Sequence, residues 1–546
     1  MKNQGKRMTG WKNNKVTRKI DLLIKGGKVY DGTGDEAYFA DIALSNERIA
    51  FISRLPGSNR VKAETVIKAE GLSIAPGFID THGHSEFTLL ADGRAEGKVL
   101  QGITTEINGN CGLSAGPLNG EAFEHREADL VEMGIKERWH TLGDYLLLLE
   151  EKGIGLNFAT LVGHGNVRGS VIGYGESGPG VYEMEKMCML VRDAIEYGAI
   201  GLSTGLIYPP GVYSETEELI SLAGCCRDFI YTSHMRSEGD ELIEAIGECV
   251  RIGRETGIPV HISHLKTSGE RNWHKAESAI SFIEEARRTG IRVTCDRYPY
   301  TAASTDLDSI LPAWTYRGGA DEELKRLKDT GLRSAITREI LAVHPQGDYW
   351  DKVTISSVQL DKNSWMEGKR LSLIAETAGK RPVDILLDVL IEERLRTGAI
   401  FYSMSEQNLE RFLSLPYMMV GSDSAARSMD GPARKGKPHP RGFGSFPRFL
   451  GRYGGEGKKI PLREAIRRIT SLPAETFRIK DRGLVREGFS ADLVVFDEER
   501  ITDRATFDEP FQGPEGIHCV YVNGSPVVWQ GVPTGVKAGR VLRHGG

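Results

Sequence analysis

The sequence APGFIDTHGH at residues 75–84 joins a short apolar run to two histidines that stand two positions apart. If the run is a strand, side chains at i and i+2 point to the same side of the sheet, so His82 and His84 face the same way. Two histidines at this spacing are common by chance. The pair becomes evidence for a metal site only if neighbouring strands end in further ligands.

Strand-like apolar runs alternate with amphipathic helical stretches from about residue 77 to about residue 472, which is typical of βα units. A closed (β/α)₈ barrel needs eight strands, whereas the sequence offers nine candidates. We expect the extra candidate to lie in an excursion between RVTCDRY and YMMVGSD, and pattern alone leaves an open doubly wound sheet as an alternative. The nine candidates are LSIAPGFIDTH, TTEINGN, NFATLVG, AIGLST, FIYTSH, PVHISH, RVTCDRY, AIFYSM and YMMVGSD.

Four further strand candidates end in a residue type that binds metals, namely Cys111, His234, His264 and Asp423. In a (β/α)₈ barrel the carboxyl ends of the strands form the rim where active sites are built. Imidazole, thiolate and carboxylate are also the ligands that zinc prefers. Each residue alone is as well explained as a buried or rim side chain. All of them at the strand ends of one array, together with the two histidines, indicate a metal centre.

Short strand-like runs also occupy both ends of the chain, and Asn523-Gly524 predicts a type I′ hairpin turn near the C-terminus. Neither end has enough strands to cover its own apolar face, so we predict that the two ends pair into one small β-sandwich domain. The predicted division is a basic leader over 1–20, the β-sandwich over 21–76 plus 473–546, and the barrel over 77–472, with an insertion at about 302–357 and a candidate lid loop at about 424–440.

The 546-residue chain has 70 basic and 75 acidic side chains and a formal net charge of −5. This balance provides no basic surface for nucleic acid or for an anionic membrane, so neither is an expected partner. The seven cysteines are odd in number and widely scattered, as in a reduced intracellular protein. No apolar stretch of about 18 residues occurs, and the basic leader lacks the apolar segment of a secretory signal, so we predict a cytoplasmic protein.

Several long and uncommon motifs follow one another along the chain. They are APGFIDTHGH, QGITTEINGNCG, STGLIYPPGVYSETEEL, HISHLK, RYPY, VGSDS and HPRGFGSFPRFLGRY, with a closing segment from GLVREGFSADLVVFD to PEGIHCVYVNG. In this order they resemble the N-acyl-D-amino-acid deacylases (D-aminoacylases) of the metal-dependent amidohydrolase superfamily, and the resemblance covers nearly the whole chain. One departure is the first motif, where members of that family often carry HTHDD and this chain has HGHSE.

The resemblance implies a barrel with a zinc centre, flanked by a sandwich built from both chain ends. Many amidohydrolases bridge two metals with a carboxylated lysine, and in this family a cysteine takes that place. The implied content is one or two zinc ions per chain. The matching ligands are His82, His84 and Asp423 at a first site, and Cys111, His234 and His264 at a second, tighter site.

The resemblance also assigns residues to the substrate. Asp423 would take a proton from water and deliver it to the leaving amine as the catalytic acid–base group. Arg441 in HPRGFG offers a planar, bidentate fork for a free carboxylate. Lys266, two residues after His264, adds a point charge on the same side, and Tyr298 in RYPY adds a hydroxyl donor.

We therefore expect zinc-dependent hydrolysis of N-acyl-D-amino acids to a carboxylate and a free D-amino acid. The alternatives are a cyclic amidase of the dihydropyrimidinase or dihydroorotase kind, a dipeptidase, and a non-catalytic barrel module. Cys111 counts against the cyclic amidases, which usually need the carboxylated lysine, and the full ligand set counts against the non-catalytic module. The D preference follows from the resemblance alone, and the sequence indicates neither the side-chain preference nor the oligomeric state.

Overall fold

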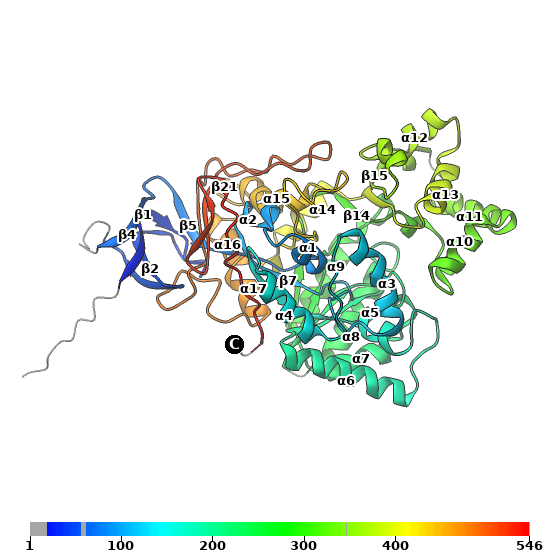
Figure 1. Ribbon diagram of the computed structural model, residues 1–546, viewed down its shortest axis with the longest axis horizontal. Helices are drawn as coiled ribbons and strands as arrows, with labels where there is room; N and C mark the ends of the chain where they lie inside the picture. Colours follow the sequence, from blue (N-terminus) through cyan, green and yellow to red (C-terminus); the bar gives the residue numbers. More distant parts are fainter. Residues whose placement is uncertain (1–18, 56–61, 227, 346, 545–546) are drawn as a thin grey trace, which may run out of the picture.

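The computed structural model describes residues 19–55, 62–226, 228–345 and 347–544. Apart from its last two residues, the basic leader predicted over residues 1–20 lies outside this part. Within it, no helix combines the length and the apolar character that crossing a membrane requires. Figure 1 shows a β-rich end in blue and red, a central barrel, and a group of helices at the opposite end.

Parallel strands form the barrel in the middle of the chain. They lie in two sheets, β6-β7-β8 and β9-β10-β11-β12-β13-β17, and every pairing within them is parallel. Only Leu161 separates β8 from β9, which links the two sheets, and a parallel bridge between Gly83 and Ser424 joins the segment after β6 to the segment after β17. The strand bounds are β6 Phe78–Asp80, β7 Ile103–Asn108, β8 Asn157–Thr160, β9 Val162–Gly163, β10 Gly201–Gly205, β11 Ile230–His234, β12 Val260–Ile262, β13 Val293–Asp296 and β17 Met418–Met419.

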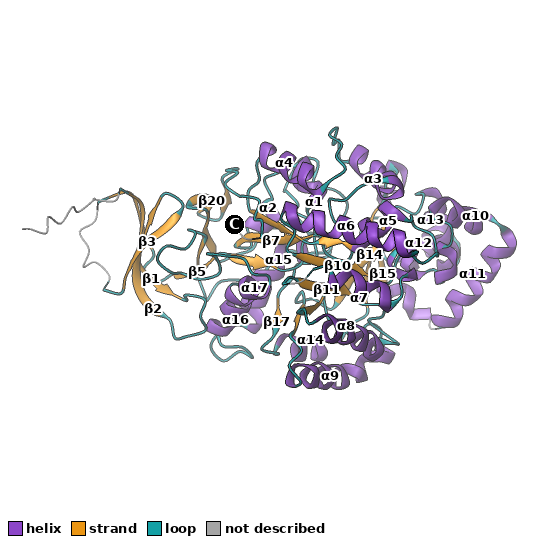
Figure 2. Ribbon diagram, turned by 90° about the horizontal axis from the view of Figure 1, so that it is seen from below, coloured by secondary structure: helices purple, strands orange, loops and turns teal. Residues whose placement is uncertain are grey.

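Helices cover the outside of this barrel, as Figure 2 shows for α7, α8 and α9. Each presents one apolar stripe to the strands, as in α8, where Ile246, Cys249 and Val250 are buried. The helices between barrel strands are α1 Glu86–Ala91, α2 Glu96–Val99, α3 Gly120–Glu132, α4 Leu142–Lys152, α5 His164–Val171, α6 Val181–Tyr197, α7 Thr216–Gly224, α8 Leu242–Thr256, α9 Ala276–Arg288 and α14 Glu406–Leu413. The closed barrel confirms the predicted fold class over the open doubly wound sheet.

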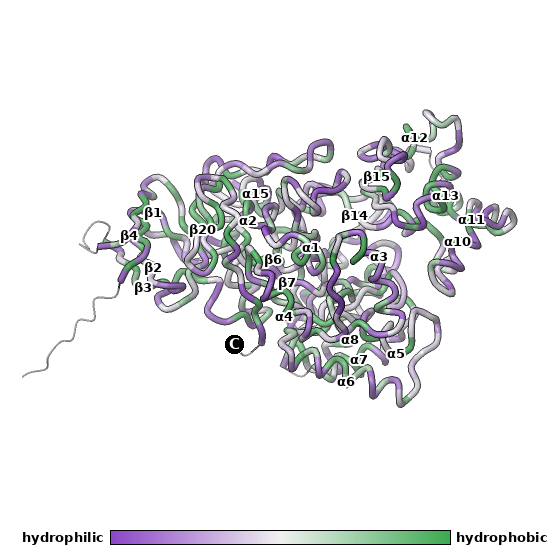
Figure 3. The backbone as a smooth tube through the Cα atoms, in the orientation of Figure 1, coloured by the Kyte–Doolittle hydropathy of each residue, from purple (hydrophilic) through white to green (hydrophobic). Residues whose placement is uncertain are grey.

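The ninth strand candidate, AIFYSM, lies outside the barrel as β16 (Gly398–Tyr402). It pairs antiparallel with β14 (Ala302–Asp306) and β15 (Val353–Ser357), so the excursion runs from β14 to β16 and extends beyond the predicted end near residue 357. Its helices are α10 Ala320–Lys328, α11 Thr330–Val343, α12 Leu371–Ala378 and α13 Pro382–Glu392. They enclose a separate hydrophobic core. The hydrophobic residues of α13 (Figure 3) include several that are buried in it.

Both chain ends contribute to one nine-stranded sheet in the order β21-β20-β19-β18-β5-β1-β2-β3, with β4 paired to β1. β5 pairs antiparallel with β18, so the two ends meet directly, whereas β1 pairs parallel with β4 and β5, which makes the sheet mixed. The strands are β1 Ile20–Val29, β2 Tyr38–Ser45, β3 Arg48–Ser53, β4 Ala63–Lys68, β5 Ser73–Pro76, β18 Leu493–Phe496, β19 Ile517–Val522, β20 Ser525–Trp529 and β21 Val532–Pro533.

The Asn523-Gly524 turn joins β19 to β20 with φ of 47° and 79°, the positive values that a type I′ turn requires. Along the chain, three helices lie between β17 and β18. They are α15 Arg441–Arg448, α16 Leu462–Arg468 and α17 Ser471–Thr476. The domain boundaries near residues 76 and 473 stay a prediction.

Candidate metal centre

The predicted ligands lie at the carboxyl ends of barrel strands, on one rim. His82 and His84 follow β6, His234 is the last residue of β11, and His264 follows β12. Cys111, His264 and Asp423 each have a positive φ, of 55°, 37° and 49°. Non-glycine residues rarely adopt this conformation, and such strained positions cluster at functional sites. Here the backbone turns sharply as each chain segment leaves its strand.

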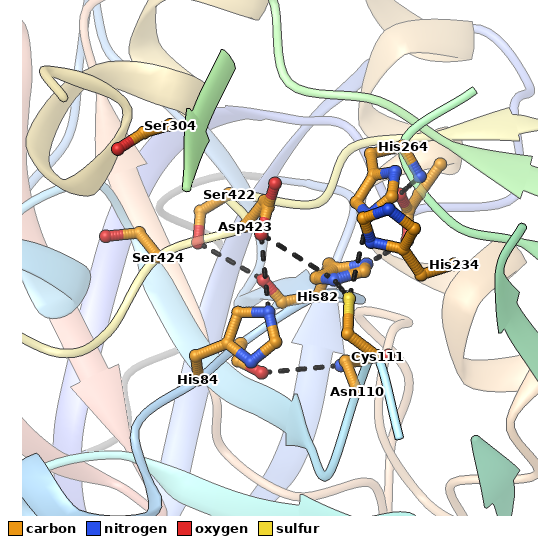
Figure 4. A network of polar contacts seen from close by, with 12 residues as sticks. His82, His84, Asn110, Cys111, His234, His264, Ser304, Ser422, Asp423 and Ser424 are labelled. Carbon is orange, nitrogen blue, oxygen red and sulfur yellow. Dashed lines mark hydrogen bonds and ion pairs between the residues drawn. The ribbon is translucent and has the colours of Figure 1, made fainter. Parts of the chain in front are cut away.

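Two groups of ligand atoms meet at Cys111. His82, His84 and Cys111 form one group, and Cys111, His234 and His264 form the other, with all ligand atoms of each group within 4.8 Å of one another. Figure 4 shows these side chains pointing toward the cysteine sulfur. Cys111 Sγ lies 3.2 Å from His82 Nε2 and 3.6 Å from His264 Nε2. The shared thiol has the position of a bridge between two sites.

Asp423 closes the first group from the side of β17. Its Oδ1 lies 3.3 Å from His84 Nε2 and 3.8 Å from His82 Nε2. Burial raises the pKa of the Asp423 carboxyl, but Arg441 and His84 outweigh this effect and hold the pKa well below its usual range. The structure thus brings all six predicted ligands together.

The electrostatics of the centre suit a cation. Burial raises the pKa of the Cys111 thiol, but the neighbouring imidazoles of His82, His234 and His264 bring the pKa well below its ordinary value. Burial lowers the pKa of the His82 imidazole, yet Cys111 and Asp296 raise it to about 10. Nε2 of His234 is buried and makes no hydrogen bond to any described residue. This donor set of imidazole nitrogens, a thiolate and a carboxylate fits zinc.

Asp296, at the end of β13, was missed by the sequence reading. Its Oδ2 lies 3.2 Å from His82 Nδ1 and 2.9 Å from His261 Nε2, and its Oδ1 accepts the backbone N–H of His264 at 2.6 Å. An acceptor at Nδ1 places the proton there and leaves Nε2 of His82 free to bind a metal. His261 contacts this carboxylate and is not part of either ligand group of the centre. The signal available in the sequence was the carboxylate of Asp296 within the strand candidate RVTCDRY, near its end.

The residues of the HGHSE variant contact β7 and the loop after it, which carries Cys111. An added Cβ at Gly83 would lie 2.1 Å from Glu106 Oε1, so a side chain there would collide with a buried carboxylate. Ser85 donates its hydroxyl to the same Glu106 oxygen at 2.8 Å. Glu86 Oε1 accepts the backbone N–H of Gly109 at 2.6 Å. Ser85 and Glu86 therefore connect the first motif to the cysteine loop.

Arg441 begins α15 and reaches the centre across the loop that follows Asp423. Its guanidinium lies 2.9 Å from Asp423 Oδ2 and donates to the carbonyl of Ser304 at 3.3 Å. The guanidinium also stacks on the ring of Tyr298, 4.6 Å from the ring centre. Tyr298 is fully buried, and its hydroxyl makes no hydrogen bond within the described chain. A buried donor without an acceptor beside a cationic fork suits an anionic ligand.

Lys266 lies beside His264 of the second ligand group and is 3% exposed. Its Nζ lies 2.9 Å from His264 Nδ1 and donates to the carboxylate of Glu238, a residue that the sequence reading also missed. Arg441 and Lys266 therefore each contact a predicted ligand, and Tyr298 stacks against Arg441. The candidate lid loop at 424–440 leads from Asp423 to α15, and the backbone N–H of Lys437 donates to Ser356 of the excursion at 2.7 Å.

The barrel and its histidine, cysteine and aspartate centre define a metal-dependent hydrolase of the amidohydrolase class. The sequence pattern of the amidohydrolase family matches residues 65–528. The chain is 35% identical to a D-aminoacylase of Alcaligenes xylosoxydans xylosoxydans over 530 residues, which is 96% of this chain and 97% of the relative. It is 35% identical to an N-acyl-D-glutamate deacylase of the same organism, over 97% of this chain and 98% of that protein.

Among solved structures, an N-acyl-D-glutamate deacylase from Bordetella bronchiseptica, complexed with zinc and a phosphonate mimic of the tetrahedral intermediate, superposes with a TM-score of 0.81. It is 34% identical and covers 96% of this chain and 100% of its own. A dihydropyrimidinase from Brevibacillus agri is 15% identical with a TM-score of 0.53, which indicates a shared fold alone. The chain belongs to the amidohydrolase family and, within it, to the D-aminoacylase (N-acyl-D-amino-acid deacylase) family.

Proposed function

We propose that the protein hydrolyses the amide bond of N-acyl-D-amino acids in a zinc-dependent reaction, releasing a carboxylate and a free D-amino acid. The observation that carries the proposal is the cysteine-centred ligand set with Arg441, Lys266 and Tyr298 beside it. A metal centre of this kind acts on an amide, and the cationic groups next to it select an amide whose amine side bears a carboxylate. The preference for the D configuration is inferred from the similarity to a D-aminoacylase and an N-acyl-D-glutamate deacylase.

His82, His84 and Asp423 would hold zinc at a first site, and Cys111, His234 and His264 at a second. The chemistry that zinc supplies in such a centre is Lewis-acid polarisation of the amide carbonyl and activation of a water molecule. Asp423 takes the proton of the attacking water on a carboxylate oxygen and returns it to the nitrogen of the leaving amine.

The substrate carboxylate is bound by Arg441 as a fork, with Tyr298 and Lys266 as further donors. Because Arg441 Nη1 is 2.9 Å from Asp423 Oδ2, the substrate carboxylate must share this guanidinium with the acid–base group. The bound carboxylate thereby sets the distance of the scissile amide from Asp423. The cytoplasmic location is part of this proposal, and the free thiols of all seven cysteines support it.

The test is hydrolysis of paired N-acetyl-D- and N-acetyl-L-amino acids, with a chelator and with zinc returned afterwards. We expect release from the D series alone, abolished by the chelator and restored by zinc. Release from neither series by a zinc-loaded protein would contradict the proposal, and cyclic amides and dipeptides would then be assayed. A purified protein without metal would favour the non-catalytic module.

A further inference from the structure

We propose that Glu238 is a positioning residue that selects the metal-binding tautomer of His264 against the competing ammonium of Lys266. Glu238 follows β11 by four residues, in the loop before α8. Its side chain is 15% exposed and its Oε1 lies 2.7 Å from His264 Nδ1. The same oxygen accepts a hydrogen bond from Lys266 Nζ. One carboxylate thus contacts a predicted ligand and a predicted substrate residue together.

The orientation of His264 determines which ring nitrogen must carry the imidazole proton when the other nitrogen binds a metal. Nε2 faces Cys111 Sγ at 3.6 Å, so the metal side of the ring is Nε2. A nitrogen that binds a metal carries no proton, so in the metal-binding tautomer the proton lies on Nδ1. Nδ1–H then needs an acceptor, and Glu238 Oε1 at 2.7 Å is that acceptor.

Lys266 creates the competition. Its ammonium has donors only, and Nζ lies 2.9 Å from His264 Nδ1. With Glu238 present, both the ammonium and Nδ1–H donate to one carboxylate. Without Glu238, the two donors would face each other at hydrogen-bond distance. The ammonium would then be satisfied by donating to an unprotonated Nδ1, which moves the imidazole proton to Nε2 and blocks the metal.

The loop geometry supports a fixed role for Glu238. Its backbone carbonyl accepts the N–H of Ser268 at 2.7 Å, which ties the loop after β11 to the segment carrying His264 and Lys266. Its other carboxylate oxygen lies 4.0 Å from His234 Nε2. The carboxylate is therefore held next to both histidines of the tighter group.

The experiment measures zinc affinity without substrate, by competition with a chromophoric chelator. We expect Glu238→Ala to weaken zinc binding by about 10- to 100-fold, the range for loss of a carboxylate that orients a ligand histidine. Lys266→Met should bind zinc like the wild type, and the double variant Glu238→Ala/Lys266→Met should recover most of the lost affinity. This recovery distinguishes tautomer selection from general damage, which a second substitution would not repair.

Glu241→Gln is the matched control, because Glu241 is exposed on the same loop, and it should leave zinc affinity and KM unchanged. If Glu238→Ala does not fold, Glu238→Gln with and without Lys266→Met carries the same comparison, with a smaller loss because an amide oxygen still accepts from Nδ1–H. Zinc affinity within about twofold of wild type, or a loss that Lys266→Met does not relieve, would overturn the proposal. The inference rests on the proposed metal set, but its readout is independent of whether N-acyl-D-amino acids are hydrolysed.

Discussion

Replacing Asp423 with asparagine separates proton transfer from metal binding. Asparagine keeps the shape of the side chain and a carbonyl oxygen, but it accepts no proton from water. Positioned acid–base groups contribute about 10²- to 10⁴-fold to rate, so we expect kcat to fall by about that factor. The tighter ligand group consists of Cys111, His234 and His264, without Asp423. Zinc in that group should therefore remain.

The ion pair of Asp423 with Arg441 predicts the effect of Asp423→Asn on KM. The two side chains are 2.9 Å apart, so the substitution removes an internal competitor for the guanidinium, and KM should not rise. The assay is steady-state hydrolysis of an N-acetyl-D-amino acid together with zinc content by elemental analysis. Asp193→Asn, at an exposed position on α6, is the control. A kcat loss below about tenfold, or loss of zinc from the tighter group along with kcat, would refute the assignment of proton transfer to Asp423.

Three further predictions follow from other contacts. Cys111→Ala should reduce zinc content and abolish hydrolysis, because Cys111 is shared by both ligand groups; full zinc occupancy by elemental analysis would contradict the bridging position. Arg441→Lys should raise KM by about 10- to 100-fold at unchanged zinc content, because a charged hydrogen bond is worth about 1.5–3 kcal/mol; an unchanged KM would exclude Arg441 from substrate binding. Burial, then Asp308, raises the pKa of Glu323 to about 8 against the opposing charge of Arg326. A raised folded-state pKa contributes stability that is lost as pH rises toward 8, by at most about 1.4 kcal/mol per pH unit. The melting temperature of Glu323→Gln should therefore rise relative to that of the wild type as the pH increases from 5 to 8. A difference in melting temperature that stays constant over this range would contradict the raised pKa of Glu323.

Much of the fold follows from local pattern. Eight of the nine strand candidates are barrel strands, because buried parallel strands are short apolar runs whose identity does not depend on distant residues. AIFYSM has the same composition but pairs antiparallel in the excursion. Its partners, β14 and β15, lie far from it in the chain, so pattern alone could not separate it from a barrel strand.

The ligands of the centre were also accessible from sequence. A barrel brings the carboxyl ends of all its strands to one rim, so a histidine, cysteine or aspartate at each strand end implies proximity without coordinates. Which carboxylate orients which ligand was not accessible in this way. Asp296 and His82 are 214 positions apart, and Glu238 and Lys266 are 28 apart. Which loop folds onto which histidine depends on the packing of the whole rim. The identity of the ligands is therefore a property of the sequence, whereas the proton position on each imidazole is set by contacts that exist only in the folded chain.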